Sequence, residues 1–457
     1  MNILILGAGQ VGCNIAESLV SLENHITIID NDDRKLAKIT ERLDIQPILG
    51  HAAHPNVLER AGAKKTDVLI AVTNVDEINI VSCEIAHALF AVPVKIARIR
   101  DQNYFQEEHK SFIFREDNIS IDYVISPEVE ISKIISQGLQ IGGSSSVIDI
   151  FDDAKLINVR CTEHSPVVNT PLKLLFNLFP DLDISIVAIQ RAGQTIIPHQ
   201  QDVIQKNDRV YLIARKSQIL EAISAFGNLE QPQKSIIIGG GGNIGKWLAV
   251  EIEKTQPALD LKIIEKSTEQ IEVIANFLKK ADLLLGDTCS QEILQGAGIE
   301  KCDTFIAVTN DDKTNILSAL LAKYYKVKNV MVLLSDKKLF QFASSLGIDS
   351  IIDPNAITVS TILSHTKQNR IKALHSIDSC VEIVEIFVED TSNIVGLSTT
   401  YDILIPGQII VAALKRGDEL ILYPDNFTIT AYDKLIIAVT KDTVYKVKKI
   451  VLDHSSY

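Results

Sequence analysis

The chain has 457 residues, a length typical of three or four domains, and its 46% hydrophobic content allows each domain a core. The net charge of −13 at pH 7 argues against a nucleic-acid-binding protein, because such proteins usually carry a basic excess or stripe. No apolar stretch approaches the roughly 20 residues that span a bilayer, and the N-terminus lacks the basic region of a signal peptide. Any role at a membrane is therefore expected to come through a partner.

The N-terminal part of the chain alternates short apolar strands with helical patterns, as at Asn79–Leu89. This alternation predicts a parallel sheet that is covered by helices on both faces. A further helix is expected at Pro127–Leu139, because proline sits well in a first helical turn. The expected strands are Asn2–Leu6, His25–Ile29, Ile45–Leu49, Val68–Val72, Val94–Ile99 and Ile121–Ile125.

A smaller, strand-rich part follows, with two short strands joined by turn residues at 191–193. It is too small for the substrate domain of an ordinary dehydrogenase. After a break near Glu230–Lys234 the same order begins again, with a corresponding helix at Pro354–Lys367 and a corresponding turn at 416–418.

The two halves of the chain are copies of one another. Residues 50–82 and 286–318 match at 15 of 33 positions without a gap, and chance does not produce such a match. Other matches pair Ile28–Asp30 with Ile263–Glu265, Ile186–Gly193 with Ile410–Gly417, and Asn207–Ala214 with Tyr432–Val439. The sequence predicts an α/β protein in which two doubly wound, Rossmann-like parallel-sheet domains (1–142 and 232–372) each precede a small α+β domain (143–228 and 373–457).

Each copy carries a glycine loop that follows a strand and opens a helix. An acidic residue, Asp30 or Glu265, ends the next strand, and this context turns the motif into a dinucleotide-binding fingerprint. The glycines allow a tight turn, close approach of a pyrophosphate and packing of helix on strand, and the carboxylate accepts hydrogen bonds from ribose hydroxyls. The loop residues are Gly7, Gly9, Gln10, Val11 and Gly12 in the first copy and Gly240, Gly242, Asn243, Ile244 and Gly245 in the second.

Some alternatives stay open at these loops. The acidic run Asn31–Asp33 would repel a 2′-phosphate and so disfavours NADP, but Asp30 alone does not separate NAD from ATP or ADP. A domain that has lost its ligand is the structural alternative. A fourth glycine, Gly239, leaves the glycine register of the second loop open.

The shared IAVTN segment is expected at the carboxyl edge of the sheet, where ligands bind in open α/β domains. Its polar residues either face the ligand or cap the following helix. These are Thr73, Asn74, Asp76 and Asn79 in the first copy and Thr309, Asn310, Asp312 and Asn315 in the second.

Two arginines, Arg98 and Arg100, end the fifth strand of the first copy and could neutralise phosphates. The gapless alignment sets Leu334 and Asp336 against them, which predicts that the second site favours NAD or stands empty. Surface ion pairs are the alternative interpretation of the two arginines.

His51 and its counterpart Asp287 are expected in a loop beside the adenine, and the pair His51 and His54 lacks a third metal ligand. The six cysteines are widely spaced without a CxxC motif, which indicates small buried thiols.

Taken together, GAGQVG, IID, IAVTNVDEIN and ARIR, followed by GGGGNIG, IIE and IAVTNDDKTNILSALLAK, resemble the TrkA family of peripheral subunits of bacterial Trk potassium-uptake systems. The resemblance covers nearly the whole chain. It implies two regulator-of-potassium-conductance (RCK) units per chain, NAD(H) and possibly ATP or ADP as ligands, and no chemical reaction. It also implies a homotetramer at the cytoplasmic side of the membrane, beneath an integral-membrane channel of the TrkH or TrkG type.

Two other functions remain as rivals. An NAD-dependent dehydrogenase would need a catalytic acid or base on a substrate domain, and a second fingerprint would be superfluous. A ligand-sensing module of another potassium transporter, such as a glutathione-gated efflux system, is commonly fused to a membrane domain, which this sequence does not contain.

Overall fold

A computed structural model describes residues 1–20, 24–105, 113–114, 118–140, 144–192, 194–226, 233–364, 371–377, 380–444, 446–447 and 451. The chain forms two compact units: one comprises residues 1–130 and 355–369, the other residues 131–354 and 370–457. The predicted break at 230–232, Gly193 and the predicted helix end at 365–367 lie outside the described residues. Within the described part, no helix is both long and apolar enough to cross a bilayer.

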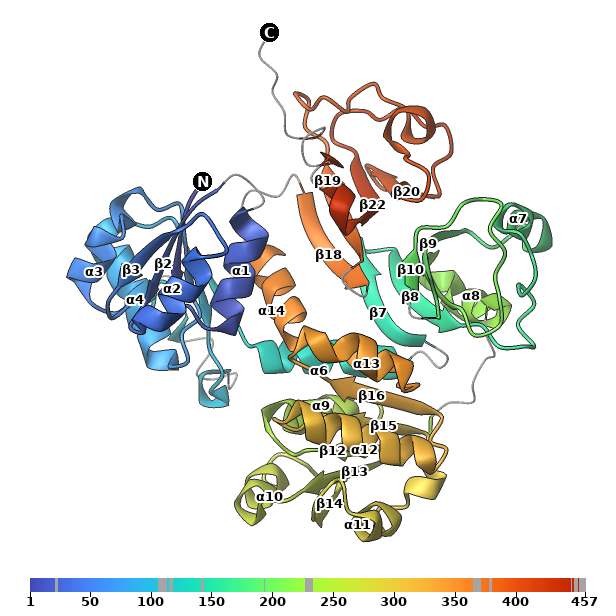
Figure 1. The fold of residues 1–457 in the computed structure, drawn as a ribbon, viewed down its shortest axis with the longest axis horizontal. Helices are drawn as coiled ribbons and strands as arrows, with labels where there is room; N and C mark the ends of the chain where they lie inside the picture. Colours follow the sequence, from blue (N-terminus) through green and yellow to red (C-terminus); the bar gives the residue numbers. More distant parts are fainter. Residues whose placement is uncertain are drawn as a thin grey trace. The chain divides into compact units, whose positions relative to one another are not determined.

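The first unit is built on a six-stranded parallel sheet with strand order β3-β2-β1-β4-β5-β6 (Figure 1). This order reverses between β1 and β4, as in a Rossmann fold, and the predicted fold class is thereby confirmed. The first and last residues of each predicted strand differ from those of an observed strand by at most two positions. The strands are β1 Asn2–Leu6, β2 His25–Asp30, β3 Gln46–Leu49, β4 Val68–Ala71, β5 Val94–Arg98 and β6 Tyr123–Ile125.

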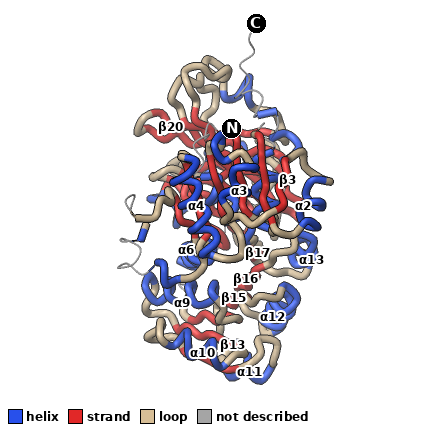
Figure 2. Tube along the Cα trace, turned by 90° about the vertical axis from the view of Figure 1, so that its left-hand side faces the viewer, coloured by secondary structure: helices blue, strands red, loops and turns tan. Residues whose placement is uncertain are grey.

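Successive residues of the central strand β1 point to opposite faces of this sheet. Ile3 and Ile5 belong to the core beneath one pair of helices, and Leu4 and Leu6 belong to the core beneath another. The first pair is α1 Gln10–Val20 and α2 Asp33–Thr40, and the second is α3 Pro55–Arg60 and α4 Asp76–Phe90. Figure 2 shows α2 and α4 flanking the strands, so the sheet is covered on both faces, as predicted.

The helices that end the two Rossmann domains are exchanged. In α14 (Pro354–Ser364), which lies beside α1 (Figure 1), Val359 and Ile362 join the core of the first sheet. Conversely, on α6 (Pro127–Gln140) the hydroxyl of Ser132 donates to the Ile244 carbonyl of the second domain at 3.1 Å. The sequence predicted both helices but did not indicate which sheet each one covers.

The second Rossmann domain repeats the topology of the first, with strand order β14-β13-β12-β15-β16-β17. Its strands are β12 Ser235–Gly239, β13 Asp260–Glu265, β14 Asp282–Leu285, β15 Thr304–Ala307, β16 Asn329–Leu333 and β17 Ser350–Ile352. Its helices are α9 Asn243–Thr255, α10 Thr268–Ala275, α11 Gln291–Gly296, α12 Asp312–Tyr324 and α13 Phe340–Ser345.

Each small domain contains a five-stranded antiparallel sheet, larger than the two strands that the sequence predicted. The sheet orders are β10-β9-β11-β8-β7 and β18-β19-β22-β20-β21, which correspond strand for strand when the second is reversed. The first has β7 Ser144–Ile150, β8 Ala154–Arg160, β9 Ile184–Arg191, β10 Gln194–Ile196 and β11 Arg209–Arg215, with α7 Leu175–Leu178 and α8 Ile219–Phe226. The second has β18 Ile371–Ile377, β19 Val381–Phe387, β20 Ile409–Arg416, β21 Glu419–Leu422 and β22 Lys434–Thr440.

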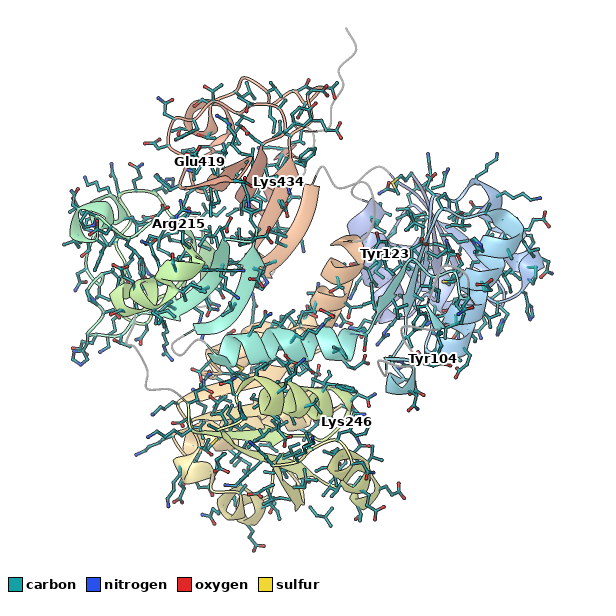
Figure 3. The ribbon with its side chains drawn as sticks, turned by 180° about the vertical axis from the view of Figure 1, so that it is seen from behind. Tyr104, Tyr123, Arg215, Lys246, Glu419 and Lys434 are labelled. Atoms are coloured by element: carbon teal, nitrogen blue, oxygen red, sulfur yellow. The ribbon has the colours of Figure 1, made fainter. Side chains whose placement is uncertain are left out.

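The two small domains share one hydrophobic core, in which Val187 and Ile213 of the first cluster with Ile383 and Ile436 of the second. Polar contacts cross the same boundary, because the Arg215 guanidinium donates to the Leu420 carbonyl at 2.6 Å (Arg215 is labelled in Figure 3). The small domains therefore form a pseudo-symmetric pair within the second unit.

An arginine fork braces each small sheet, and sequence reasoning missed it. Arg191 binds both carboxylate oxygens of buried Asp208, and Arg416 binds both of Asp433. Burial alone would raise the pKa of Asp433, but hydrogen bonds from Arg416 and the Thr430 amide hold that pKa below its usual value. The forks make Arg191 the counterpart of Arg416. The gapless alignment of Ile186–Gly193 with Ile410–Gly417 was therefore wrong by one position at this arginine.

Candidate functional site

The first glycine loop joins β1 to α1, and each of its glycines has a distinct environment. Gly7 has φ of +106°, in the region that disfavours side chains, and its N–H donates to the Ile29 carbonyl at 2.7 Å. A Cβ on Gly12 would lie 1.9 Å from the Gly7 carbonyl oxygen, so α1 can pack on β1 only with glycine there. A Cβ on Gly9 would meet nothing within 4 Å, which leaves open space above the loop.

The second loop, between β12 and α9, has the same construction. Gly240 has φ of +110°, and a Cβ on Gly245 would lie 1.9 Å from the Gly240 carbonyl oxygen. The geometry therefore settles the register that Gly239 had left open: Gly239 ends the strand, and Gly240, Gly242 and Gly245 correspond to the three glycines of the first loop.

A carboxylate at the end of the second strand is tied to each loop. Asp30, only 8% exposed, accepts from the Ala8 amide at 2.7 Å through one oxygen and from the Asp32 amide at 2.9 Å through the other. Glu265 accepts from the Gly241 amide at 2.8 Å and from the Ser267 amide at 2.9 Å. Each carboxylate oxygen keeps a further lone pair, so the group can also accept from a ribose hydroxyl.

The two loops differ at the residue behind the first glycine. Glutamate is one methylene longer than aspartate, and the loop residue facing it is correspondingly smaller: Gly241 stands where the first copy has Ala8. A Cβ on Gly241 would lie 2.4 Å from the Ile274 Cδ1 atom. The side chain of Gln270 also donates to the Gly241 carbonyl at 2.8 Å and so closes the second loop with an additional bond.

Lys35 is the first copy's counterpart of this glutamine. Its ammonium lies 3.7 Å from one Asp30 oxygen, while the Lys35 side chain is half exposed. The first copy thus places a cation beside the Asp30 carboxylate, where the second places an amide that holds the loop.

Asn79 and Asn315, predicted either to face the ligand or to cap a helix, are fully buried in the first turns of α4 and α12. The Asn79 amide oxygen accepts from the N–H and the hydroxyl of Thr73, at 2.9 and 2.7 Å, and its NH₂ group donates to the Arg98 carbonyl at 2.8 Å. Asn315 makes the corresponding bonds to Thr309 and to the Leu333 carbonyl. Both asparagines therefore lock the IAVTN edge to the fifth strand.

Asp76 also holds backbone: its carboxylate accepts from the amides of Arg100 and Asp101 at 2.8 and 2.7 Å. In the second copy, Asp312 accepts from the amides of Ser335 and Asp336. These bonds correct the alignment, because Ser335 is the counterpart of Arg100.

By the same register, Leu333 is the counterpart of Arg98, since each supplies the carbonyl that binds the buried asparagine. The prediction that Leu334 and Asp336 replace the arginines was wrong by one residue. The cause lies at a helix end. A left-handed residue follows each helix, Ala91 after α4 and Lys326 after α12. The second copy reaches this residue one position earlier, so every later residue is shifted by one in the alignment.

Both arginines of the first site lie beside acids. The Arg98 guanidinium is 3.8 Å from the Glu128 carboxylate, and both side chains are less than one-fifth exposed. Burial lowers the pKa of Arg98 and raises the pKa of Glu128. Arg100 donates to the Asn74 carbonyl and lies 3.9 Å from Asp76, so its side chain covers the loop that carries the predicted site residues.

The loop after β3 carries His51, whose Nδ1 accepts from the Ala53 amide at 3.3 Å and whose ring lies 4.7 Å from that of His54. Its counterpart Asp287 likewise accepts from the Cys289 amide. Among the described residues, no group of three potential metal ligands comes together. The cysteines are free; three are buried, Cys13 and Cys289 are half-buried and Cys380 is exposed.

The predicted site residues therefore converge from separate strands on one edge of each sheet. The IAVTN edge adjoins the glycine loop: a Cβ on Gly7 would lie 3.1 Å from the Thr73 backbone, and one on Gly242 would lie 3.8 Å from the Asn310 amide oxygen. The helices α1 and α9 begin directly after the open glycines, at Gln10 and Asn243, and direct their N-terminal N–H groups to this edge.

Comparisons with known proteins agree with this geometry. The family model described as the TrkA-N domain matches residues 3–127 and again residues 236–354, and the TrkA-C domain model matches residues 156–227. The two matches of the first model coincide with the two Rossmann domains.

Curated relatives extend over nearly the whole chain. A protein named Trk system potassium uptake protein TrkA from Azorhizobium caulinodans is 41% identical over 453 residues, covering 98% of each chain. One of the same name from Vibrio alginolyticus is 35% identical, covering 96% of this chain and 95% of its own.

Among solved structures, the GsuK RCK domain superposes with a TM-score of 0.60 at 16% identity, covering 98% of this chain and 94% of its own. A GsuK channel bound to NAD gives the same TM-score at 17% identity, covering 98% of this chain and 78% of its own. These structures share the fold of the tandem Rossmann and small domains.

Proposed function

The chain belongs to the TrkA family of potassium-uptake proteins, and we propose that it is the nucleotide-binding subunit that regulates a Trk-type potassium channel. The observation that carries the proposal is the pair of complete glycine loops. In each, a Cβ on the second glycine would meet no atom closer than 3.8 Å, and a carboxylate at the end of the next strand is hydrogen-bonded to the loop.

The ligand that we propose is NAD(H), with ATP or ADP as further ligands of the same loops. The pyrophosphate would lie at the N-termini of α1 and α9, and the ribose at Asp30 or Glu265. The solved GsuK channel that shares this fold was described with NAD bound, which supports the choice. Thr73, Asn74 and Arg100 in the first site, and Thr309 and Asn310 in the second, would border the ligand.

The partner that we propose is an integral-membrane channel subunit of the TrkH or TrkG type, with this chain at the cytoplasmic face of the membrane as a homotetramer. Apolar side chains are exposed on both α4 and α12, and they support association of copies. Val81 and Leu89 are 46% and 58% exposed, and Leu317 and Tyr324 are 52% and 74% exposed. The proposed domain boundaries remain 1–142, 143–228, 232–372 and 373–457.

Regulation requires that a nucleotide favour one arrangement of the assembly over another, because a ligand with equal affinity for both states shifts nothing. We propose no chemical turnover: the groups lining the two loops are committed to backbone hydrogen bonds and ion pairs rather than poised as acid and base.

The test combines binding and transport. Mass spectrometry should find adenine nucleotides retained by the purified protein, and calorimetry with NADH and ATP should show binding without product. Potassium uptake by cells lacking the protein should be restored by the parent chain but not by a variant with both Asp30→Ala and Glu265→Ala. Product formation at about one per second or faster, or uptake unaffected by that variant, would refute the proposal.

A further inference from the structure

The first small domain contains a cavity of about 370 Å³ that the nucleotide sites do not use. It lies between strand β9 and the segment that contains α7, and this volume is within the range of small-molecule sites, roughly 300–1,000 Å³. Its apolar wall includes Leu172, Leu175, Phe179, Leu182, Ile184 and Ile186.

The second small domain completes the cavity. Ile410 of β20 and Tyr423 of the following loop line it together with the wall residues of the first domain. An occupant would therefore contact both small domains at the edge of the core that they share. Such an occupant would stabilise the pair, because it binds only where the two domains are together.

The mouth of the cavity is polar and carries one unengaged cation. The Gln200 side chain donates to the Tyr423 hydroxyl at 2.8 Å, and the Asp425 carboxylate accepts from the Thr400 hydroxyl at 2.9 Å. Lys173 lines the cavity and is exposed, and among the described residues its ammonium has no ion-pair partner. The mouth therefore carries one cation, Lys173, and one carboxylate, Asp425, and the carboxylate already accepts a hydrogen bond from Thr400.

The repeat provides an internal comparison. Matching β-bridges, Pro171 to Val203 and Ser398 to Thr428, set Thr399 and Thr400 of the second domain against Leu172 and Lys173 of the first. The cavity beside these threonines measures only about 160 Å³ and adjoins the first, with which it shares Gln200 and Tyr423 among its lining residues. An apolar interior with a cation at its mouth is thus a feature of the first small domain.

We propose that this cavity binds a small amphipathic carboxylate, with an acyl chain in the apolar interior and the carboxylate at Lys173. Burial of the chain provides most of the affinity, because each methylene removed from water contributes about fourfold. The ion pair at the exposed mouth contributes less, about two- to fivefold. The proposal does not depend on nucleotide binding.

Calorimetry on the full chain, with sodium decanoate as the probe below its micelle concentration, tests the proposal. Decanoate should saturate one site per chain, octanoate should bind about fifteenfold more weakly, and decanol should bind about two- to fivefold more weakly. Absence of saturable decanoate binding overturns the proposal, and equal affinity for decanol overturns the assignment of a carboxylate head group.

Two variants locate the site. Lys173→Ala should weaken decanoate about two- to fivefold and leave decanol unchanged, whereas Lys206→Ala, an exposed lysine of the same domain that does not line the cavity, should change neither. Ile186→Trp should fill the cavity and abolish both, with NADH binding unchanged as evidence of a folded chain. If Lys173→Ala binds decanoate as tightly as the parent does, the carboxylate is not at this mouth. This result is decisive whether or not Ile186→Trp folds.

Discussion

The two nucleotide loops of this chain share their backbone but differ in what surrounds it. In the first, the Asp30 carboxylate bonds to the Ala8 amide, and Lys35 adds a cation nearby. In the second, Glu265 and Gln270 both bond to Gly241, and Ile274 fills the space that a larger residue would need.

This difference teaches that a duplicated motif can keep its backbone geometry while the packing and the charge around it diverge. The second loop is held at both the N–H and the carbonyl of one residue, so it has less freedom to adapt to a ligand. In the first loop the Ala8 carbonyl accepts from the Cys13 thiol at 3.4 Å, which is a weaker donor than the Gln270 amide. The first site also has more charge, with Arg98 and Arg100 at the fifth strand where the second copy has Leu333 and Ser335. We therefore expect the first site to discriminate among nucleotides by charge and the second to do so by fit.

The largest loss of binding is expected at the third glycine, whose close contact is the same in both loops. Gly12→Ala places a Cβ 1.9 Å from the Gly7 carbonyl, and Gly245→Ala does so at Gly240. Each change should cost about 1–3 kcal/mol of stability and abolish nucleotide binding at its own loop, lowering the calorimetric stoichiometry by one. Gly296→Ala, which meets nothing within 4 Å, is the matched control. Unchanged stoichiometry in either loop variant would contradict this account.

Removing the carboxylate at the end of the second strand should weaken nucleotide binding at one loop without affecting the other. Asp30→Ala and Glu265→Ala each remove a charged acceptor, which should weaken binding at the corresponding loop about ten- to a hundredfold. The shorter acid in Glu265→Asp should restore only part of the loss, because the bond to the Gly241 amide spans a longer side chain. Calorimetry with NADH measures all three, and full affinity in Glu265→Ala would mean that the second loop holds no ribose.

The packing difference can be tested by exchanging the loop residues. Gly241→Ala should weaken NADH at the second site about tenfold, because its Cβ would lie 2.4 Å from Ile274 Cδ1. Adding Ile274→Val removes that methyl and should recover most of the affinity. Ala8→Gly should change binding at the first site by less than about threefold. A double variant no better than Gly241→Ala alone would show that Ile274 is not the obstacle.

Exchanging the charges should have a smaller effect. Arg100→Ser makes the first site resemble the second and should weaken ATP about two- to fivefold more than NADH, since a partly exposed guanidinium contributes about 0.2–1 kcal/mol. Ser335→Arg should do the reverse at the second site. Calorimetry of both ligands at low and high salt checks the result, and equal losses for ATP and NADH would assign Arg100 a structural role.

The smallest effect concerns pH and should be confined to the first unit. Burial raises the pKa of Glu128, so its contribution to stability is present below the unfolded-state pKa and is lost as pH rises through the raised folded-state pKa. As pH rises from about 4 toward neutral, the melting temperature of the parent should therefore fall relative to that of Glu128→Gln. Parallel pH profiles for the two proteins would exclude this contribution.

Much of the fold followed from the sequence, because its determinants are local. The alternation of Ile3 and Ile5 with Leu4 and Leu6 predicts a strand buried on both faces, and the spacing of Gly7, Gly9 and Gly12 predicts the turn into a helix. Repetition of both patterns after residue 232 established two such domains before any contact was known.

Register and partner choice were decided by the tertiary structure. A gapless alignment could not detect that α12 reaches its left-handed end one residue earlier than α4, so it paired Arg100 with Asp336; only the hydrogen bonds of Asp76 and Asp312 revealed Ser335 as the counterpart. Likewise, the apolar pattern of Pro354–Ser364 predicts a helix but suits either sheet equally well. Its place on the first sheet depends on the shape of a core assembled from residues more than two hundred positions away, which no local pattern encodes.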